Sequence, residues 1–335
     1  MVTFLTGATG FIGGAILDRL LRKGEHVMPL VRREAAARQL AAKGAHPVVG
    51  DLLSPATYQE ALRGADCVVH AAGLNVFCLT DPRPLYEVNV EGTRFLLQAA
   101  GEVGVKRVVY TSSAATIGEA SGHVAVEETA HRGTFLSHYE RAKFDAEQLA
   151  LDCARHGLPI VVLNPSSVQG PGRLHGTARI FLDYLNGRLP FICGTWFSFL
   201  YLDDCVDAHI NAREMGRAGE RYLLSGASVD IQELLQTLEE VTGLRRRLWQ
   251  VGPKLALALS TAMEWGDRLR GRRPKFCREL IRSVLHGGRY DSSKAERELK
   301  LSFTPLREIV TRTATWYAQA GHVKHPLPRL ASGRS

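Results

Sequence analysis

The sequence has no long apolar run, no Cys-x-x-Cys pair and almost no residues before its first strand-like segment. No apolar run approaches the ~20 residues that a helix needs to cross a bilayer. The first apolar run begins at Val2, which leaves no room for a signal peptide. Without paired cysteines or a Cys/His cluster, the chain lacks the usual patterns of zinc and thiol-redox sites. We therefore expect a cytoplasmic protein without a metal site.

Cysteine is sparse and scattered, with six residues in the whole chain. In the cytoplasm such thiols are kept reduced. We expect all six to be free and mostly buried. They are Cys67, Cys78, Cys153, Cys193, Cys205 and Cys277.

Apolar and charged residues make up 45% and 23% of the chain, as is ordinary for a soluble globular protein. With 335 residues, the chain is long enough for one large or two medium domains. The net charge of +8 is uneven, because residues 245–289 hold twelve Lys or Arg and three Asp or Glu. Clustered Lys and Arg usually form a solvated face, and no nucleic-acid recognition motif accompanies them. We expect no nucleic acid partner.

The same basic segment contains the apolar stretch 253–259. This stretch is too short to span a membrane but long enough to belong to a helix. Leucines beside a basic flank suit a helix that lies on an anionic membrane surface. Two interpretations stay open: a helix packed on its own domain, and a helix in peripheral contact with a membrane.

Three glycines near the N-terminus have the spacing Gly7-x-x-Gly10-x-x-Gly13. They follow the apolar run 2–5 and open a segment with apolar residues at helical spacing. Glycine permits the unusual dihedrals of a tight turn and lets a pyrophosphate approach the helix N-terminus. The spacing differs from the common Gly-x-Gly-x-x-Gly fingerprint. The motif predicts a dinucleotide site.

Short apolar runs alternate with helix-like segments through the first half of the chain. This order predicts an α/β fold with a doubly wound parallel sheet of the Rossmann type. After Asn164-Pro165 the rhythm loosens, and glycines and a proline at 170–172 mark a turn. We predict a dinucleotide-binding domain at 1–168 and a smaller, helix-rich substrate lobe at 169–335, parts of which return to the sheet. The expected strands are 26–31, 47–49, 67–70, 107–111 and 160–163, and the expected long helices are 84–102 and 137–156.

Tyr139 and Lys143 are four residues apart, so on a helix they share one face. A tyrosine with a pKa near 10 is a weak base at neutral pH, and an adjacent ammonium favours its phenolate. Tyr and Lys at this spacing are also common on helix surfaces. Beside a dinucleotide motif, they predict a proton-transfer pair whose lysine also holds the ribose.

Several short motifs occur in a fixed order. They are Gly7/Gly10/Gly13, Gly50-Asp51-Leu52, His70-Ala71-Ala72-Gly73, Asn89-Val90-Glu91-Gly92-Thr93, Val109-Tyr110-Thr111-Ser112-Ser113, Tyr139-Glu140-Arg141-Ala142-Lys143, Asn164-Pro165, Tyr201-Leu202-Asp203-Asp204 and Asp291-Ser292-Ser293-Lys294. Over nearly its whole length the chain thereby resembles the extended short-chain dehydrogenase/reductase superfamily, in its NAD-dependent epimerase/dehydratase group. Within that group it is most similar to dihydroflavonol-reductase-like and hydroxysteroid-dehydrogenase-like members.

The resemblance implies four catalytic residues. Tyr139 would be the general acid/base, with Lys143 as its electrostatic partner, and Ser113 would polarise the substrate oxygen. Asn89 would support the active-site helix. A strand-end serine can instead be a cap, and an asparagine inside a helix can simply make a structural hydrogen bond.

The resemblance also implies the cofactor-binding residues. They are Gly7, Thr9, Gly10, Phe11, Ile12, Gly13, Arg32, Asp51, Leu52, Ala71, Ala72, Gly73, Thr111, Tyr139, Lys143, Pro165 and Val168. Asp51 can alternatively cap a turn. Relatives commonly form homodimers through a four-helix bundle, here expected from 84–102 and 137–156.

The cofactor preference follows from charge. NAD sites usually place a carboxylate after the second strand, whereas a 2′-phosphate calls for arginine. Here Arg32 and Arg33 follow the strand, and no acid occurs until Glu34. We expect NADP(H) to be preferred, with Arg32 as the phosphate ligand and NAD(H) as the alternative. The other interpretation is two solvated arginines.

The residues that this chain has at the positions of the family's dehydratase and epimerase motifs indicate the reaction type. Dehydratases of the superfamily have Thr-Asp-Glu where this chain has Ser113-Ala114, so dehydration is disfavoured. Residues 194–200 carry no charge and three aromatic side chains, which suits an apolar or aromatic substrate, or else the core of the lobe. Arg173 or Arg179 could still bind a diphosphate. We predict a ketone reductase or secondary alcohol dehydrogenase, with a nucleotide-sugar epimerase and a non-catalytic cofactor-sensing regulator as alternatives.

Overall fold

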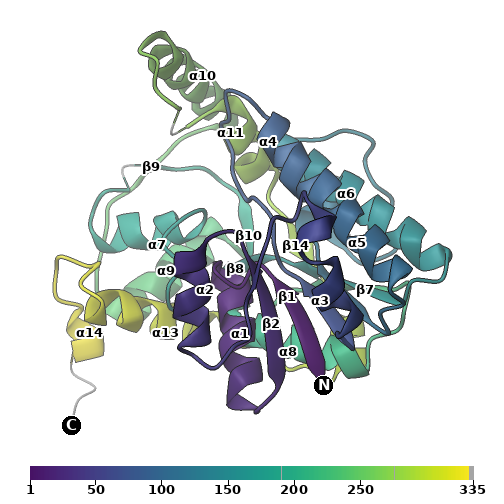
Figure 1. Ribbon diagram of the computed structural model, residues 1–335. Coiled ribbons are helices and arrows are strands. Elements are labelled where there is room, and N and C mark those ends of the chain that lie inside the picture. Colours follow the sequence, from purple (N-terminus) through teal and green to yellow (C-terminus); the bar gives the residue numbers. More distant parts are fainter. Residues whose placement is uncertain (190, 275, 332–335) are drawn as a thin grey trace.

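Seven parallel strands form the central sheet of the computed structural model, which describes residues 1–189, 191–274 and 276–331 (Figure 1). The strand order is β11-β7-β5-β4-β1-β2-β3. The strands are β1 (Val2–Thr6), β2 (His26–Val31), β3 (Val48–Val49), β4 (Cys67–His70), β5 (Val108–Thr111), β7 (Ile160–Pro165) and β11 (Arg221–Leu224). The predicted Rossmann-type sheet is confirmed, and each strand expected from the sequence lies within two residues of its predicted bounds.

The sequence explains why these segments are central strands. β4, β5 and β7 are rich in valine and isoleucine, and every residue in them is buried, as expected for a sheet covered on both faces. In the register, Thr6 pairs with His70, His70 with Tyr110, and Thr111 with Leu163. The carboxyl ends of four strands therefore meet at one edge, where doubly wound sheets bind their ligands.

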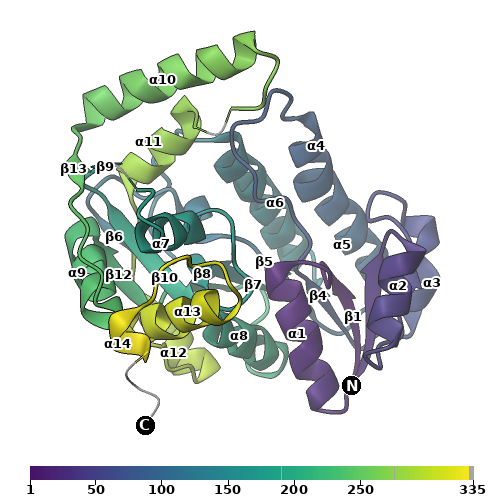
Figure 2. The same cartoon turned by 90° about the vertical axis from the view of Figure 1, so that its left-hand side faces the viewer.

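Helices cover both faces of the sheet (Figures 1 and 2). A hydrophobic cluster lies on each face of the sheet, between the strands and the helices that cover them. The helices of one face are α1 (Phe11–Arg22), α2 (Glu34–Ala41), α8 (Leu202–Glu214) and α12 (Ser293–Leu299); those of the other are α3 (Gln59–Arg63), α5 (Gly92–Glu102) and α6 (His138–Arg155). A short helix, α4 (Arg83–Tyr86), and a π-helical segment (Glu87–Glu91) lead into α5. Together they match the predicted helix 84–102, and α6 matches 137–156.

A second, smaller layer packs beside the large sheet. Its three-stranded sheet has the order β12-β10-β8 and its own hydrophobic cluster. It comprises β8 (Ser167–Gln169), β10 (Trp196–Tyr201), β12 (Ala227–Asp230), α7 (Ala178–Leu185), α9 (Ile231–Thr242), α13 (Leu306–Gln319) and α14 (Pro328–Ala331). Short strand pairs, β9 (Phe191–Ile192) with β13 (Trp249–Gln250) and β6 (Val124–Ala125) with β14 (Arg289–Tyr290), connect neighbouring loops.

The aromatic stretch in 194–200 lies mainly in the core of this lobe. Phe197 and Phe199 belong to the lobe's hydrophobic cluster, and Phe199 stacks edge-on against Phe181. Trp196 instead lies under the guanidinium of Arg289. The expectation that this stretch supplies an aromatic wall for the substrate is therefore wrong for the two phenylalanines, because the strand alternation turns both toward the lobe interior.

Two helices project from the lobe as an arm, α10 (Pro253–Leu269) and α11 (Arg278–His286), which pack against each other. Figure 2 shows α10 along the outer edge of the molecule, away from both sheets. Of the helices that the structure describes, none is long and apolar enough to cross a membrane. One basic residue of the segment, Lys275, lies outside the described residues.

One disulfide bond joins the arm to the large domain. Cys78 and Cys277 are bonded, with their Cα atoms 5.5 Å apart and a sequence separation of 199. The expectation of six reduced thiols is wrong for this pair, while the other four cysteines are free. Disulfides are rare in the cytosol. The cysteines therefore no longer support a cytoplasmic location, and that location stays a prediction.

Candidate active site

The glycine motif forms a tight turn between β1 and α1. Gly7 has φ +79°, and a Cβ there would lie 2.6 Å from the carbonyl carbon of Ala71. A Cβ on Gly13 would lie 2.2 Å from the carbonyl oxygen of Gly7. Both glycines are thus required by close backbone approach, and Gly7 also by its left-handed conformation. The turn residues Thr9 and Gly10 and the first-turn residues Phe11 and Ile12 follow directly.

The N-terminus of α1 is open to an anion. Its N-cap is Gly10, which offers no side-chain acceptor, and its first turn contains no acidic residue. The first N–H groups of a helix lack intrahelical partners and attract negative charge. The turn therefore fits a pyrophosphate, as the sequence predicts.

A buried histidine fixes the facing turn after β4. The Thr6 hydroxyl accepts from the Ala72 N–H at 3.2 Å and lies 2.7 Å from His70 Nδ1. His70 Nε2 lies 2.9 Å from the Thr93 hydroxyl, which donates to the Asn89 carbonyl oxygen. Burial lowers the pKa of His70 to about 3, so the imidazole is neutral. One tautomer satisfies this chain: Thr6 donates to Nδ1, and Nε2–H donates to Thr93.

Asn89 holds the loop that follows. Its Oδ1 accepts from the Leu74 N–H at 2.7 Å, and its Nδ2 donates to the Leu74 carbonyl at 3.0 Å. A Cβ on Gly73 would lie 3.3 Å from Asn89 Oδ1. Asn89 itself lies in the π-helical segment, an irregularity often found at functional sites. The geometry matches the structural hydrogen-bond interpretation and positions the loop 73–74.

Ser113, Tyr139 and Lys143 come together beyond the end of β5. Ser113 caps a short 3-10 helix and accepts from the Ala115 N–H at 3.3 Å. Its hydroxyl also hydrogen-bonds Tyr139. Tyr139 lies in the first turn of α6, whose N-cap Ser137 accepts from the Glu140 N–H. The geometry matches the cap interpretation of Ser113, and its predicted action on a substrate oxygen stays a prediction.

Lys143 is buried one helical turn after Tyr139. It donates to the Tyr110 hydroxyl at 3.0 Å and to the Thr111 carbonyl at 2.8 Å. Burial lowers the pKa of Lys143 to about 8, and the charge of Glu147 opposes this shift. Because both of its acceptors are neutral, the ammonium is held without an ion pair.

The charge of Arg173 acts on Tyr139, whereas the sequence analysis considered Arg173 only as a possible diphosphate ligand. Burial raises the pKa of Tyr139, while the Ser113 hydrogen bond and the charge of Arg173 lower it. The Arg173 guanidinium lies over the Phe11 ring, 5.3 Å from its centre. Among the described residues no carboxylate pairs with Arg173, whereas Arg179 pairs with Asp183 at 3.6 Å. Arg173 therefore lies between the glycine turn and the tyrosine, free to meet an anion.

The other predicted cofactor residues divide into two groups. Arg32 is exposed directly after β2, and Thr111 and Pro165 end β5 and β7. Asp51, by contrast, accepts from the Leu53 N–H at 2.9 Å and so closes its own turn. Val168 is buried in the core between the layers.

Leu52 lies beside Asp51 and packs under the start of α5. A Cβ on Gly92 would lie 2.6 Å from Leu52 Cδ2. Its side chain is therefore a packing contact between this turn and α5.

The sequence analysis missed a buried carboxylate, Glu147. Its Oε2 accepts from Ser112, Thr116 and Asn164, and its Oε1 accepts from Arg221 at 2.9 Å. These partners come from the ends of β5 and β7, the 3-10 helix and β11, so one carboxylate aligns α6 with the sheet edge. The signal was present, because Glu147 lies four residues after Lys143 on the same helix face.

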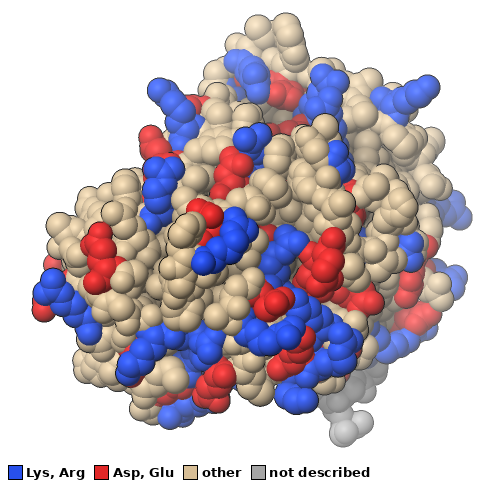
Figure 3. Space-filling model, turned by 90° about the vertical axis from the view of Figure 1, so that its right-hand side faces the viewer, with Lys and Arg blue, Asp and Glu red and all other residues tan. Residues whose placement is uncertain are grey.

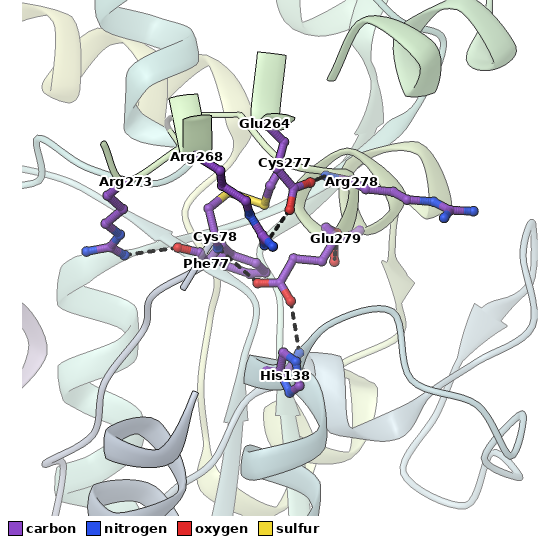
Figure 4. The surroundings of a disulfide bond; sticks show 10 residues. Phe77, Cys78, His138, Glu264, Arg268, Arg273, Cys277, Arg278 and Glu279 are labelled. Atoms are coloured by element: carbon purple, nitrogen blue, oxygen red, sulfur yellow. Dashed lines mark hydrogen bonds and ion pairs between the residues drawn. A yellow bond between two sulfur atoms is a disulfide. The ribbon is translucent and has the colours of Figure 1, made fainter. Parts of the chain in front are cut away.

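The disulfide fastens the arm beside the tyrosine (Figure 4). Glu279, in the first turn of α11, accepts from the Cys78 N–H at 2.9 Å and from the His138 N–H at 3.3 Å. Arg273 donates to the Phe77 carbonyl at 2.9 Å, and the Phe77 ring lies 5.5 Å from that of Tyr139. The arm therefore holds both the loop beside Tyr139 and the first residue of its helix.

The pKa of Lys143 predicts a pH dependence of stability. The folded-state pKa is about 8 and the ordinary value is 10.5, so the unfolded state binds more protons between these values. The free energy of unfolding therefore rises with pH over that window through this residue. We expect the difference in unfolding free energy between wild type and Lys143→Met, from urea titrations without cofactor, to rise from about pH 8 to about pH 10.5. A difference that stays flat with pH would contradict the buried ammonium.

The Cys78–Cys277 bond predicts a stability loss on its removal. Cys277→Ser should lower the unfolding free energy by about 2–4 kcal/mol, whereas Cys193→Ser, at a free and half-buried thiol, should change it little. Alkylation of the unreduced, unfolded chain followed by mass measurement should label four cysteines. Labelling of all six would show that the bond is absent.

Comparisons with known proteins agree with this geometry. The family model described as "NAD dependent epimerase/dehydratase family" matches residues 3–225. Sterol demethylase protein B of Methylococcus capsulatus is 32% identical over 96% of this chain and 100% of its own length. The 4-hydroxy-2-methyl-3-oxo-4-farnesyl-3,4-dihydroquinoline-1-oxide ketoreductase of Stigmatella aurantiaca is 28% identical over 89% and 91%. The crystal structure of gox2253 superposes with TM-score 0.82 and 32% identity, over 96% of this chain and 99% of that one. The chain belongs to the NAD-dependent epimerase/dehydratase family and is an NAD(P)-dependent oxidoreductase.

Proposed function

We propose that this chain transfers a hydride between a nicotinamide cofactor and the carbonyl or alcohol carbon of an apolar small molecule. The observation that carries the proposal is the meeting of Ser113, Tyr139 and Lys143 at the sheet edge that also bears the glycine turn. A protein that only senses its cofactor needs the turn but not the proton-transfer group, so the trio favours catalysis.

The residues of the binding edge fit a dinucleotide. Gly7, Gly10 and Gly13 leave the α1 N-terminus open to a pyrophosphate, and the small residues Ala71 and Ala72 keep the facing turn free of bulk. Lys143 and Tyr139 lie where a nicotinamide ribose would be held. When bound, the nicotinamide supplies or accepts the hydride.

Each residue of the trio has a distinct task. The Ser113 hydroxyl donates to the carbonyl oxygen and fixes its position, and the Tyr139 hydroxyl gives its proton to that oxygen as the alcohol forms. The positive charges of Arg173 and Lys143 stabilise the phenolate that remains. In the oxidative direction the same phenolate takes the alcohol proton. Addition of one hydride and one proton converts the ketone to the secondary alcohol.

The names of the relatives guide the substrate class. The two relatives described above are named for a sterol and for a farnesylated quinoline oxide, both largely apolar. In this chain a pocket of about 580 Å³ opens beside the start of α6, where Leu79, Phe135, Leu136 and Trp265 line it together with the charged residues Arg141, Glu264, Arg268, Arg278, Glu279 and Arg282. We infer a lipophilic ketone or secondary alcohol, with a polycyclic or prenylated skeleton as the first choice.

Replacement of the tyrosine hydroxyl tests the proposal. With NADPH and a panel of sterol-like, aromatic and prenylated ketones, Tyr139→Phe should lower kcat on the order of 10²- to 10⁴-fold, because the proton donor is lost. Tyr184→Phe, which removes a hydroxyl that donates to the Leu244 carbonyl in the smaller lobe, is the matched control and should keep kcat. Wild-type protein that reduces no ketone but epimerises a UDP-sugar would overturn the proposal.

We propose that Arg32 makes NADP(H) the preferred cofactor. It is exposed after β2, and no carboxylate within the described part of the chain pairs with it. Arg32→Asp should lower the ratio of kcat/KM for NADPH to that for NADH by about tenfold or more, as expected for loss of a charge-assisted hydrogen bond. Arg38→Asp, at an exposed position of α2, is the control. An unchanged ratio in Arg32→Asp would contradict this role.

A further inference from the structure

Helix α10 turns its apolar side toward solvent. A surface helix normally buries its apolar stripe against the protein core. In α10 the buried positions are Ala256 and Ser260, both small. The large side chains Leu255, Trp265 and Leu269 are 54%, 68% and 82% exposed. The large apolar side chains of α10 therefore face solvent, and its small side chains face the rest of the protein.

The exposed residues form one continuous stripe. Leu255, Leu259, Ala262 and Met263 recur at spacings of three or four, so they lie on one helix face. All four are exposed, and the stripe extends to Leu269 along a helix of 17 residues, about 25 Å in length. In Figure 2 no other described helix or strand lies on the outer side of α10. An exposed apolar stripe of this size marks an interaction surface.

Basic side chains surround the stripe. The arm, residues 253–286, contains eight Lys or Arg and three Asp or Glu. Lys254, Arg270 and Arg272 are exposed at its ends. Two of the acids are already engaged within the protein, Glu264 with Arg268 at 2.6 Å and Glu279 with the backbone beside Tyr139. On the face in Figure 3, the upper part, where the arm lies, is mostly uncharged and basic, whereas both signs are interspersed below.

We propose that the arm docks on a bilayer containing anionic lipids, with the stripe of α10 in the interface and the flanking Lys and Arg at the headgroups. Leu and Trp on one face with basic residues around them are the composition of helices that lie in a membrane surface. Each Lys or Arg near an anionic surface adds to the attraction. A second copy of the chain is a poorer partner for this surface, since pairing two arms would bring together charges of the same sign.

The position of the arm gives this docking a consequence for the site. The pocket at its base is lined by Trp265 and Arg268 of α10 and by Ser137 and His138 at the start of α6. Tyr139 itself follows His138 in α6, and its ring lies 5.5 Å from that of Phe77, whose neighbour Cys78 lines the pocket. A lipophilic molecule that leaves the bilayer at the arm would meet this pocket before bulk water. This step rests on the proposed function, whereas the docking itself does not.

Co-sedimentation of the full chain with vesicles tests the docking. Wild type should bind vesicles of phosphatidylcholine with phosphatidylglycerol, bind pure phosphatidylcholine at least about tenfold more weakly, and be released by salt. The double variant Leu255→Glu/Leu269→Glu should lose binding to the mixed vesicles by about tenfold or more. Met215→Glu, at an apolar position 40% exposed and outside the arm, is the matched control and should bind as wild type does.

A charge-reversal variant separates the contribution of the basic side chains to vesicle binding from that of the apolar stripe. Arg270→Glu/Arg272→Glu should weaken binding to the mixed vesicles by about tenfold or more, and Lys23→Glu, exposed at the end of α1, should not. Turnover of a water-soluble ketone without vesicles should be equal in all these variants, which separates loss of docking from failure of the proposed reaction. Any one of three results would overturn the proposal. These are no vesicle binding by wild type, equal binding of wild type to both vesicle types, and self-association of a wild type that binds no vesicles, abolished by Leu269→Glu.

Discussion

The buried ammonium of Lys143 constrains the whole candidate site. It has a carbonyl and a phenol as acceptors and no paired carboxylate, so its charge is costly to bury unless the surroundings are fixed. Glu147, the nearest acid to act on it, is itself held by four donors from the sheet edge. These two charges together tie α6, and with it Tyr139, to the carboxyl ends of β5 and β7 and to β11.

Local patterns in the sequence predicted the frame of the fold. The strands β1 to β5 and β7 are short apolar runs, and α5 and α6 have clear helical periodicity, so their bounds could be inferred from neighbours in sequence. The glycine turn and the Tyr139–Lys143 pair could be placed for the same reason. The sheet-edge partners of Glu147, the partner role of Arg173 and the Cys78–Cys277 bond could not, because each depends on contacts between residues far apart in the chain. Phe197 and Phe199 were misplaced because composition does not tell which side of a strand faces the lobe interior.

The arm links the outer surface of the molecule to the loop and helix beside Tyr139. At one end α10 exposes its apolar stripe, and at the other Glu279 and the disulfide hold the loop and helix beside Tyr139. Such a connection needs no moving part: a fixed arm is enough to set the pocket against a membrane surface. Homodimer formation through α5 and α6 stays a prediction.

The central claim is direct hydride transfer between nicotinamide and a carbonyl carbon at the Tyr139 site. The most direct measurement is reduction of a lipophilic ketone with NADPH deuterated at C4, followed by mass spectrometry of the alcohol. The account predicts one deuterium on the carbinol carbon when one face of the nicotinamide carries the label, and none when the other face does. An alcohol without deuterium from either labelled cofactor, or cofactor oxidation without alcohol, would contradict it.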